Sequence, residues 1–501
     1  MKEQISILPA LACLIPAGAG ILIFAGGRLG AWFWKGIAVL GGLATAVVAG
    51  LMAAKVLGGG SLTTWSNELH VDALSALLVA VIAGVGSLAV IYSIRYITLP
   101  ALLDRVGRDI IERRLPTFYG LTMLFLGTMI WGCVTNNIIM LYVAVEATTI
   151  ASGLLVAFYW DRNGLEAGYK YLMLLTIGIT FALFGCVLIY AAATAYLPGV
   201  QALLMTEIKG VAGSIPRSTA LMAVALLVVG FGTKAGIAPF HPWLPDAHAE
   251  APTPMSVLLS GVMIKMAVYA LARTVSMFLP AWPVISIFLV ALACFTMVLG
   301  ILMALLQDDL KRLLAYSSVS QMGYVLMGLG IGTYLGCYGG LFHLLNHAVF
   351  KALLFMGVGA VIYATNGRQI SELGGLGKKM PITSGCFFIG ALAISGFPPF
   401  NGFMSKITIY LAAAERGMWW AATIAIVTGV LTLVTLIHTA YAVFWGEPRS
   451  EKATADIKEV PASMWVPMVI LAGVCILLGI VPQVVYPLLD KAAAALATLG
   501  S

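Results

Sequence analysis

Residues 236–240 read Gly-Ile-Ala-Pro-Phe, and 160 residues later residues 396–400 read Gly-Phe-Pro-Pro-Phe. Each copy interrupts a long apolar run, and proline removes a backbone donor and clashes with the preceding helical turn. We therefore predict two broken membrane helices at equivalent places in an internal repeat. A chance match of five residues is the alternative, and the matching number of helices around each copy argues against it.

The composition around these breaks is that of a membrane protein. Of the 501 residues, 61% are hydrophobic and 10% are charged, and the mean hydropathy is +1.00. Soluble domains carry about 25% charged residues, so a set of soluble domains is excluded. The seven cysteines are scattered without a CxxC pair, which excludes a disulfide framework, an iron–sulfur site and a c-type haem. The net charge of +7 reflects loop orientation and indicates no nucleic-acid partner.

The apolar runs predict an all-α polytopic membrane protein with about fourteen transmembrane helices, each of about 20 residues. The expected spans lie near 5–25, 31–56, 72–97, 118–135, 137–160, 168–196, 219–238, 254–278, 283–305, 312–331, 334–364, 381–411, 419–445 and 463–487. Spans 4–8 correspond to spans 9–13 at one offset. Because five is odd, the second copy enters the membrane upside down, which gives two inverted five-helix repeats with broken helices 7 and 12.

The repeat also predicts the domain organisation. We expect an N-terminal three-helix segment over 1–116, repeats over 117–280 and 281–446, and a loop with a C-terminal helix over 447–501. The first apolar run has only Lys2 before it and no convincing cleavage site, so we interpret it as a retained helix rather than a signal peptide.

The basic loop residues predict the orientation. If the N-terminus lies outside, most of them fall in inner loops, among them Arg95, Arg105, Lys311, Arg368 and Lys452. The positive-inside rule then places both termini on the outer, periplasmic or extracellular, side of an inner (plasma) membrane.

Ionisable residues inside the spans are the strongest functional signal. Each costs about 2.5–3.5 kcal/mol at a helix centre, so stability alone would replace them with leucine. They are Glu146, Lys170, Lys234, Lys265, Lys351 and Lys406. Lys234 and Lys406 flank the two breaks, where unwound backbone and water gather.

Structural explanations compete for each of these residues. Lys170 lies near a span end, where its side chain can reach the interface. Glu146 paired with a lysine would make a static bridge, and Lys265 would serve as a lone donor to a carbonyl. A titrating role accounts for the whole set with one explanation.

Histidines extend the pattern. His343, His347 and Lys351 are spaced i, i+4, i+8 and share one helix face over about 12 Å. A metal at the two histidines lacks a third ligand, and we predict none. His241 and His248 flank the first break and are candidates for proton uptake from water. His438 is interpreted as a packed helix residue.

Lysine suits proton transfer in a membrane because burial and a movable carboxylate partner act on its proton affinity in opposite directions. A Glu–Lys pair that closes and opens is therefore a switch, and a water-bridged file of such groups is a proton wire. We predict a proton relay made of Glu146, Lys234, Lys265, His343, His347, Lys351 and Lys406.

The chain resembles the antiporter-like subunits of respiratory complex I, the Mrp sodium/proton antiporters and the membrane-bound energy-converting hydrogenases. The stretches that carry this resemblance are Tyr142-Val-Ala-Val-Glu146, residues 232–248 (GTKAGIAPFHPWLPDAH), Ala251-Pro-Thr-Pro-Met-Ser256, residues 307–318 (QDDLKRLLAYSS) and residues 396–403 (GFPPFNGF). The resemblance implies fourteen helices and two inverted repeats. It also implies that Glu146 and Lys234 are an essential pair, that Lys265 is the central lysine and that Lys406 lies on the exit side.

The resemblance also bears on partners and cofactors. It implies other membrane subunits, homologous antiporter-like subunits and a redox module, and no cofactor in this chain itself. Lys406 stands where one complex I subunit type has glutamate, and the chain ends without that complex's long lateral helix. Both features are similar to hydrogenase-type and Mrp-type subunits.

Three functions remain open at this point. The leading one is a proton-translocating, non-catalytic subunit of a redox-driven oxidoreductase complex, of the energy-converting hydrogenase or complex I type. The second is a subunit of an Mrp-type sodium/proton antiporter, and the third is a structural scaffold with a vestigial proton path. A small-molecule symporter would need a substrate pocket at the breaks, and the sequence shows no clear sign of one.

Overall fold

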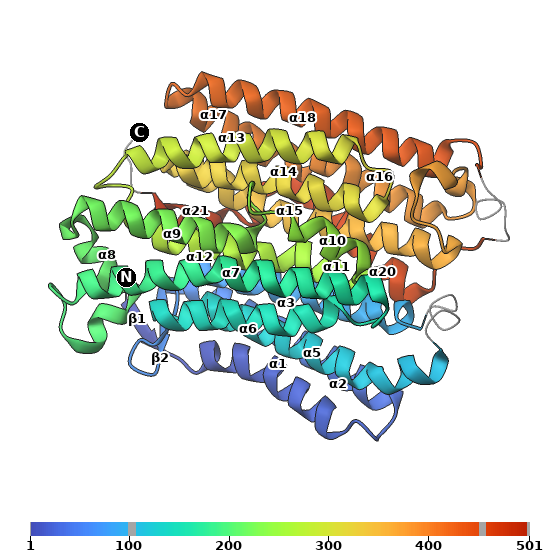
Figure 1. Cartoon of the computed structure of the whole chain (residues 1–501), viewed down its shortest axis with the longest axis horizontal. Helices are drawn as coiled ribbons and strands as arrows, with labels where there is room; N and C mark the ends of the chain where they lie inside the picture. The colour runs from blue at the N-terminus through green and yellow to red at the C-terminus, as the bar shows by residue number, and fades with distance from the viewer. Residues whose placement is uncertain (1, 99–106, 450–456, 498–501) are drawn as a thin grey trace.

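The computed structural model describes residues 2–98, 107–449 and 457–497 (Figure 1). In this part of the chain, twelve helices are long and apolar enough to cross a membrane, which confirms a multi-pass membrane protein. The predicted count of fourteen is not reached by this measure. One helix, Leu310–Ile331, carries two basic and several polar residues, and another, Pro381–Ser395, has only 15 residues.

The helices follow one another with short connections. Those of the first half are α1 (Leu8–Ala25), α2 (Ala31–Gly59), α3 (Ala73–Tyr96), α5 (Arg108–Val134), α6 (Ile138–Val156), α7 (Arg162–Ala193), α8 (Met205–Val211), α9 (Arg217–Ala235), α10 (Trp243–Glu250), α11 (Thr253–Leu258) and α12 (Ile264–Val275). Those of the second half are α13 (Val284–Leu305), α14 (Leu310–Ile331), α15 (Tyr334–Thr365), α16 (Pro381–Ser395), α17 (Asn401–Glu415), α18 (Trp419–Ala440), α20 (Ala462–Ile480) and α21 (Tyr486–Leu496).

A small sheet departs from the predicted all-α fold. Strands β1 (Lys2–Ile5), β2 (Gly60–Thr64) and β3 (Leu69–Val71) form it, with β1 parallel and β3 antiparallel to β2. β2 and β3 contain apolar and β-branched residues such as Leu62, Thr63 and Val71, whereas β1 is mostly polar and its backbone groups are satisfied by pairing with β2. The short helices α8 and α21 were likewise not predicted.

Both predicted helix breaks are confirmed. Helix α9 ends at Ala235 and α16 ends at Ser395, and the next residues, Gly236 and Gly396, adopt left-handed conformations with φ of 73° and 80°. Glycine suits such a position because it has no Cβ. The chain resumes as α17 after the second break and as α10, a helix of 8 residues beyond the predicted span, after the first.

The helices run side by side along one direction, and both termini lie at the end that carries the strands, called here the strand end (Figure 1). Helix α5 ends there, since Thr135 pairs with Leu69 of β3, whereas α13 leads away from it to Asp309, which pairs with Gln369. The two five-helix runs therefore enter with opposite sense, as inverted repeats require. The basic residues Arg105 and Lys452 lie outside the described residues, and the domain boundaries stay a prediction.

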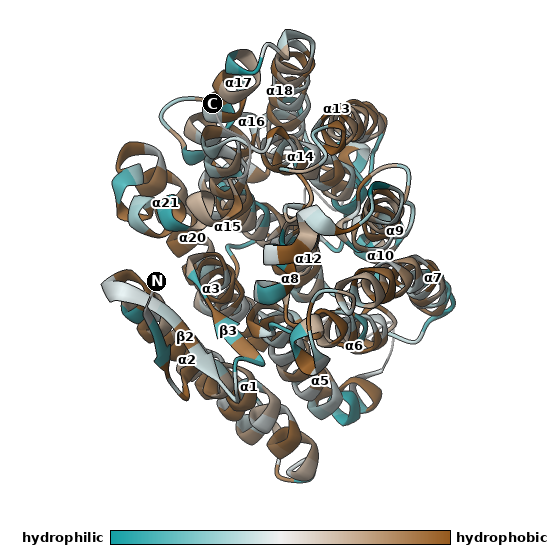
Figure 2. Cartoon of the chain, turned by 90° about the vertical axis from the view of Figure 1, so that its left-hand side faces the viewer, coloured by the Kyte–Doolittle hydropathy of each residue, from teal (hydrophilic) through white to brown (hydrophobic). Residues whose placement is uncertain are grey.

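The centre of the molecule is the segment α11–α12, whose apolar stretch is completely buried (Figure 2). Helix α15 is 83% buried over the corresponding stretch, whereas α7 at the rim is only 39% buried. Apolar side chains cover much of this rim, as expected for a surface that faces lipid or other membrane subunits.

Candidate functional site

The predicted pair of Glu146 and Lys234 lies between α6, α7 and α9. Lys234 is buried, and its Nζ donates a hydrogen bond of 2.6 Å to the Thr149 hydroxyl. Glu146 is half-buried, and one carboxylate oxygen accepts a hydrogen bond of 3.1 Å from Thr176. Within the described residues, the two side chains form no ion pair with each other. The structure therefore shows this predicted pair in an open arrangement.

Lys265 lies at the centre of the molecule on α12. It is completely buried, and its Nζ donates to the backbone carbonyl of Ser260. Ser260 belongs to a π-helical turn over Leu259–Met263, which connects α11 to α12. Such turns leave backbone groups available and are frequent at functional sites. The turn thus gives Lys265 a neutral acceptor in place of a carboxylate.

Helix α15 carries His343, His347 and Lys351, all completely buried. His343 makes hydrogen bonds of 3.0 Å with Ser405 of α17 and 3.1 Å with Gln321 of α14. Lys351 donates to the Leu314 carbonyl and the Ser317 hydroxyl of α14 at 2.8 and 2.5 Å.

His347 differs from its two neighbours on α15. Neither of its ring nitrogens has a hydrogen-bond partner among the described residues. A buried imidazole without partners is costly, so this position has polar groups available for water or a transferred proton.

Lys406 follows the second break. It is buried, and its Nζ donates to the carbonyls of Ile394 and Ser395 at 2.9 and 3.3 Å. The same Nζ lies 4.6 Å from the centre of the Tyr324 ring. A cavity of about 210 Å³ borders this lysine and Gly396. The site holds a cation by backbone dipoles and an aromatic face.

These groups extend from α9 across α12 and α15 to α17. The positive charges of Lys265 and Lys351 lie near enough to repel each other, both lysines act in the same way on a charged His347, and Lys406 acts so on His343. Within the described chain, Lys234 and Lys265 share no hydrogen bond or ion pair. The predicted relay residues thus lie on neighbouring helices, and the relay itself stays a prediction.

The remaining predicted residues are more varied. His248 of α10 is completely buried, stacks on Phe355 at 4.7 Å, and has no hydrogen-bond partner on either nitrogen among the described residues. His241 lies in the break, partly exposed. His438 is exposed on α18, so the interpretation as a packed residue is wrong. The helix places it on a face that points away from its neighbours.

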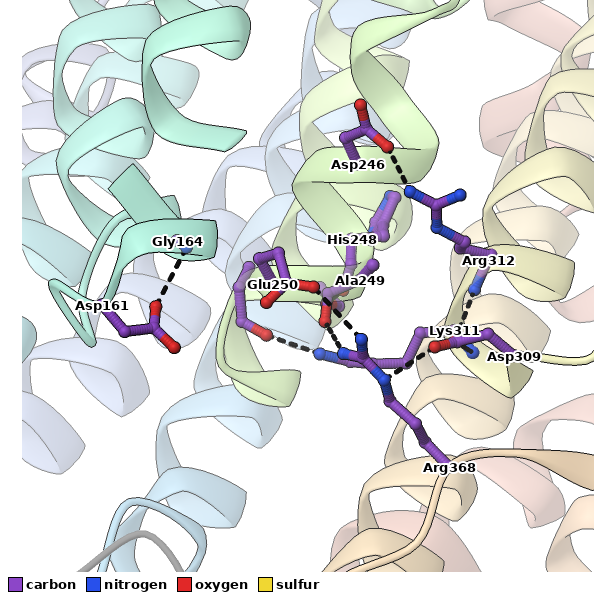
Figure 3. A network of polar contacts seen from close by, with 12 residues as sticks. Asp161, Gly164, Asp246, His248, Ala249, Glu250, Asp309, Lys311, Arg312 and Arg368 are labelled. Carbon is purple, nitrogen blue, oxygen red and sulfur yellow. Dashed lines mark hydrogen bonds and ion pairs between the residues drawn. The ribbon is translucent and has the colours of Figure 1, made fainter. Parts of the chain in front are cut away.

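A polar network connects the two halves at the end opposite the strands (Figure 3). Asp246 of α10 pairs with Arg312 of α14 at 2.5 Å and lies 3.7 Å from Lys170 of α7. Arg368, just after α15, contacts Glu250 at 3.1 Å and Asp309 at 2.7 Å.

Two backbone contacts complete this network. Arg368 donates to the Ala249 carbonyl at 2.7 Å, and Lys311 of α14 donates to the carbonyl of Ala251. We call these contacts the clamp, since they hold α10 against α14 and the end of α15. Lys170, whose role the sequence left undecided, lies at the edge of the clamp. Its Nζ is 2.7 Å from Glu166, and its side chain is 49% exposed.

At the strand end, a cavity of about 330 Å³ is lined by residues that include His70, Asp72, Lys209, Tyr269 and Arg273. Burial alone would raise the pKa of Asp72, but the paired Arg273 guanidinium and the Ser75 amide lower it to about 2. Tyr269 and Arg273 follow Lys265 at four-residue intervals. A single face of α12 therefore runs from this cavity to the central lysine.

The sequence identified the charged groups but missed their neutral partners. Thr149, Thr176, Gln321, Ser405 and Tyr324 contact them, and no single residue of this kind stands out in a membrane sequence. Thr149 offered one usable signal, since it lies three residues after Glu146 and so shares its helix face.

Comparisons with known proteins agree with this geometry. Residues 135–432 match the family model described as NADH:quinone oxidoreductase/Mrp antiporter, TM, and residues 62–99 match that of NADH-ubiquinone oxidoreductase (complex I), chain 5 N-terminus. NADH-quinone oxidoreductase subunit N of Desulforudis audaxviator is 33% identical, over 83% of this chain and 82% of its own length. A hydrogenase-4 component F homolog of Methylacidiphilum infernorum is 32% identical, over 81% of this chain and 85% of its own.

A solved structure is similar over nearly the whole chain. It is a chain from the membrane-bound sulfane sulfur reductase, an archaeal respiratory membrane complex, with a TM-score of 0.87, 28% identity and coverage of 98% of both chains. The matched model covers more than half of the sequence and includes both breaks. The chain therefore belongs to the NADH:quinone oxidoreductase/Mrp antiporter family of membrane subunits.

Proposed function

We propose that this chain is a proton-translocating membrane subunit of a redox-driven, multi-subunit complex. The observation that carries the proposal is the state of the buried lysines. Lys234, Lys265, Lys351 and Lys406 contact hydroxyls, carbonyls or aromatic rings, and within the described residues none forms an ion pair. Buried charges that serve structure are normally paired, whereas unpaired ones are free to gain and lose protons.

The arrangement suggests how protons pass. Each lysine has a neutral acceptor that accommodates both its charged and its neutral form, so a proton can leave without breaking an ion pair. Unpartnered imidazole nitrogens at His248 and His347 offer further sites for water-borne protons. Movement of Lys234 towards Glu146 would favour the protonated lysine. Movement away would release the proton to the next residues of the proposed relay.

The chain's place in an assembly follows from its relatives. The redox centres of the complex are expected in partner subunits. Homologous antiporter-like subunits are expected beside the apolar rim of this chain. We place it in an inner (plasma) membrane. The clamp end is rich in basic residues, among them Lys311, Arg312 and Arg368, so by the positive-inside rule it faces inward and both termini face outward.

The proposal is tested by replacing Lys234 with alanine in the whole complex reconstituted into vesicles. We expect proton transport to fall by about a hundredfold, the lower range for loss of a positioned proton-transfer group. Electron transfer in the partner subunits should continue, so the measured ratio of protons to electrons should fall. The matched control is Lys491→Ala, which removes a lysine that contacts backbone at the strand end.

Two outcomes would overturn the proposal. An unchanged ratio in Lys234→Ala would show that the row carries no protons and that the chain is a scaffold. Sodium-dependent proton exchange by the complex with no electron donor present would instead assign it to a cation/proton antiporter.

A further inference from the structure

The open arrangement of Glu146 and Lys234 depends on two threonine hydroxyls. The Thr149 hydroxyl accepts a hydrogen bond from the Lys234 Nζ at 2.6 Å, and the Thr176 hydroxyl donates one to Glu146 Oε1 at 3.1 Å. Thr149 belongs to α6 and Thr176 to α7. The two partners of the pair are thus held by different side chains on two neighbouring helices.

Thr149 is oriented to accept from the lysine. It is completely buried, and its hydroxyl is within 3.4 Å of the Val145 carbonyl, one turn earlier, to which it donates a long hydrogen bond. A hydroxyl has one proton and two lone pairs, so donation to the helix leaves the lone pairs for Lys234. Thr149 is also one turn from Glu146, which makes it the acceptor beside the carboxylate on the same helix face.

The side chain of Lys234 lies in closely packed surroundings. Its Nζ lies 5.9 Å from the centre of the Tyr171 ring, and the Tyr171 hydroxyl is held by Ser152 at 2.5 Å. Helices α7 and α9 approach closely here, since a Cβ on Gly178 would lie 2.6 Å from the Thr233 side chain. A change in the position of the Lys234 Nζ would therefore need a rotation of its side chain rather than a displacement of α9.

Glu146 is held by one oxygen only. Oε1 accepts from Thr176, whereas Oε2 is shielded from solvent and has no hydrogen-bond partner among the described residues. A shielded carboxylate oxygen without a donor is costly and gains from any ammonium that reaches it. Within the described residues, Oε1 of the carboxylate is thus hydrogen-bonded, and Oε2 is without a partner and can accept a hydrogen bond.

We propose that Thr149 and Thr176 are positioning residues that hold Lys234 and Glu146 apart, so that the lysine must leave the Thr149 hydroxyl to reach Oε2 of Glu146. The inference rests on the proposed proton-transport function. In the resting state the hydroxyl competes with the carboxylate for the same Nζ, and transport requires both positions to be populated. Without the hydroxyl, Lys234 stays on Glu146 and the cycle slows.

The experiment replaces Thr149 with valine, which keeps the shape and removes the hydroxyl, in the reconstituted complex. We expect proton transport to fall about tenfold, because a hydrogen bond to a charged group is worth about one order of magnitude in an equilibrium constant. Thr149→Ser should restore transport. A structure of the valine variant complex should show Lys234 Nζ within ion-pair distance of Glu146.

The neighbouring threonine supplies a matched control. Thr148 is also completely buried, but its hydroxyl donates only to the Val145 carbonyl of its own helix. Thr148→Val should therefore transport like the wild type. Thr176→Val provides a second test because it removes the hydrogen bond to Glu146 Oε1, and we expect proton transport to fall about threefold, since a typical hydrogen bond contributes little net free energy.

The outcomes separate this inference from the proposed function. If Lys234→Ala abolishes transport but Thr149→Val behaves like Thr148→Val, the positioning role is wrong while the relay stands. Failure of Thr149→Ser to restore transport would also overturn it. If Thr149→Val does not assemble, Thr176→Val decides, and wild-type transport in that variant contradicts the proposal. Normal transport in Lys234→Ala overturns the proposed function itself.

Discussion

The two helix breaks share a backbone plan but place their charges differently. At the first, Gly236 N donates to Thr233 and Ile237 N to Gly232; at the second, Gly396 N donates to Ala393 and Phe397 N to Leu392. With the same offset of 160, Lys234 corresponds to Ile394, and Asp246 corresponds to Lys406. One repeat therefore carries its buried lysine before the break, and the other carries it after the break.

The difference follows from what each break leaves unpaired. Pro398 and Pro399 stand where donors for the Ile394 and Ser395 carbonyls would be, and Lys406 takes both carbonyls. At the first break, the Trp243 indole donates to the Thr233 carbonyl at 2.8 Å, and Lys234 donates to a side-chain hydroxyl. Lys406 is thus bound to fixed backbone, whereas Lys234 is bound to a partner it can exchange.

The largest expected effect tests whether the backbone-bound lysine also carries protons. Lys406→Met should lower proton transport about a hundredfold, as for loss of any positioned proton-transfer group. The measurement is the ratio of protons to electrons in vesicles. If proton transport persists while thermal stability falls, Lys406 only satisfies the carbonyls of the second break. The lysine of the first break would then carry protons and that of the second would not.

A smaller effect is expected from the two left-handed glycines. Gly236→Ala and Gly396→Ala should each destabilise the protein by about 1–2 kcal/mol, the cost of this conformation for a residue with a Cβ. The new Cβ would lie 2.6 Å from Leu244 Cδ1 at the first break and 2.9 Å from Lys406 Cδ at the second.

Transport should separate these two variants. Gly396→Ala displaces Lys406 and should lower proton transport at least about tenfold, since small displacements of reacting groups slow their reactions strongly. Gly236→Ala displaces a leucine and should lower stability with little effect on proton transport. Thermal melting of the purified complex and transport assays on the same samples make the comparison. Equal transport in both variants would show that the position of Lys406 is not critical.

The smallest effect concerns the indole at the first break. Trp243→Phe removes the hydrogen bond to the Thr233 carbonyl and should lower stability by about 1 kcal/mol. The Thr233 carbonyl keeps its hydrogen bond from Gly236 N and lies one residue from Lys234, so transport should change only modestly. A loss of transport as large as that of Lys234→Ala would mean that the indole, rather than Thr149, positions the lysine.

The sequence predicted the parts of the fold that hydrophobicity and proline control. Apolar runs located the spans, and the two Gly–Pro–Phe stretches located the breaks, because a missing donor acts locally. The strand at Lys2–Ile5 and the helix at Trp243–Glu250 were missed, since both depend on partners far along the chain.

The site was predicted only as a set of charges. Buried lysines stand out in an apolar sequence, so Lys265 and Lys351 were found without a structure. Their acceptors were not, since Ser260 and Leu314 contribute backbone carbonyls that any residue type would supply. The open arrangement of Glu146 and Lys234 was equally invisible, because it depends on side-chain positions rather than on spacing.

The clamp has a mechanical consequence. Arg368 alone contacts Ala249, Glu250 and Asp309, so the segment after the first break and the helices of the second repeat share one guanidinium. A displacement of α10 would therefore act directly on α14 and on the end of α15 through these contacts. The two repeats are thus joined by ion pairs at the clamp, whereas Lys265 and Lys351 at the centre contact neutral acceptors.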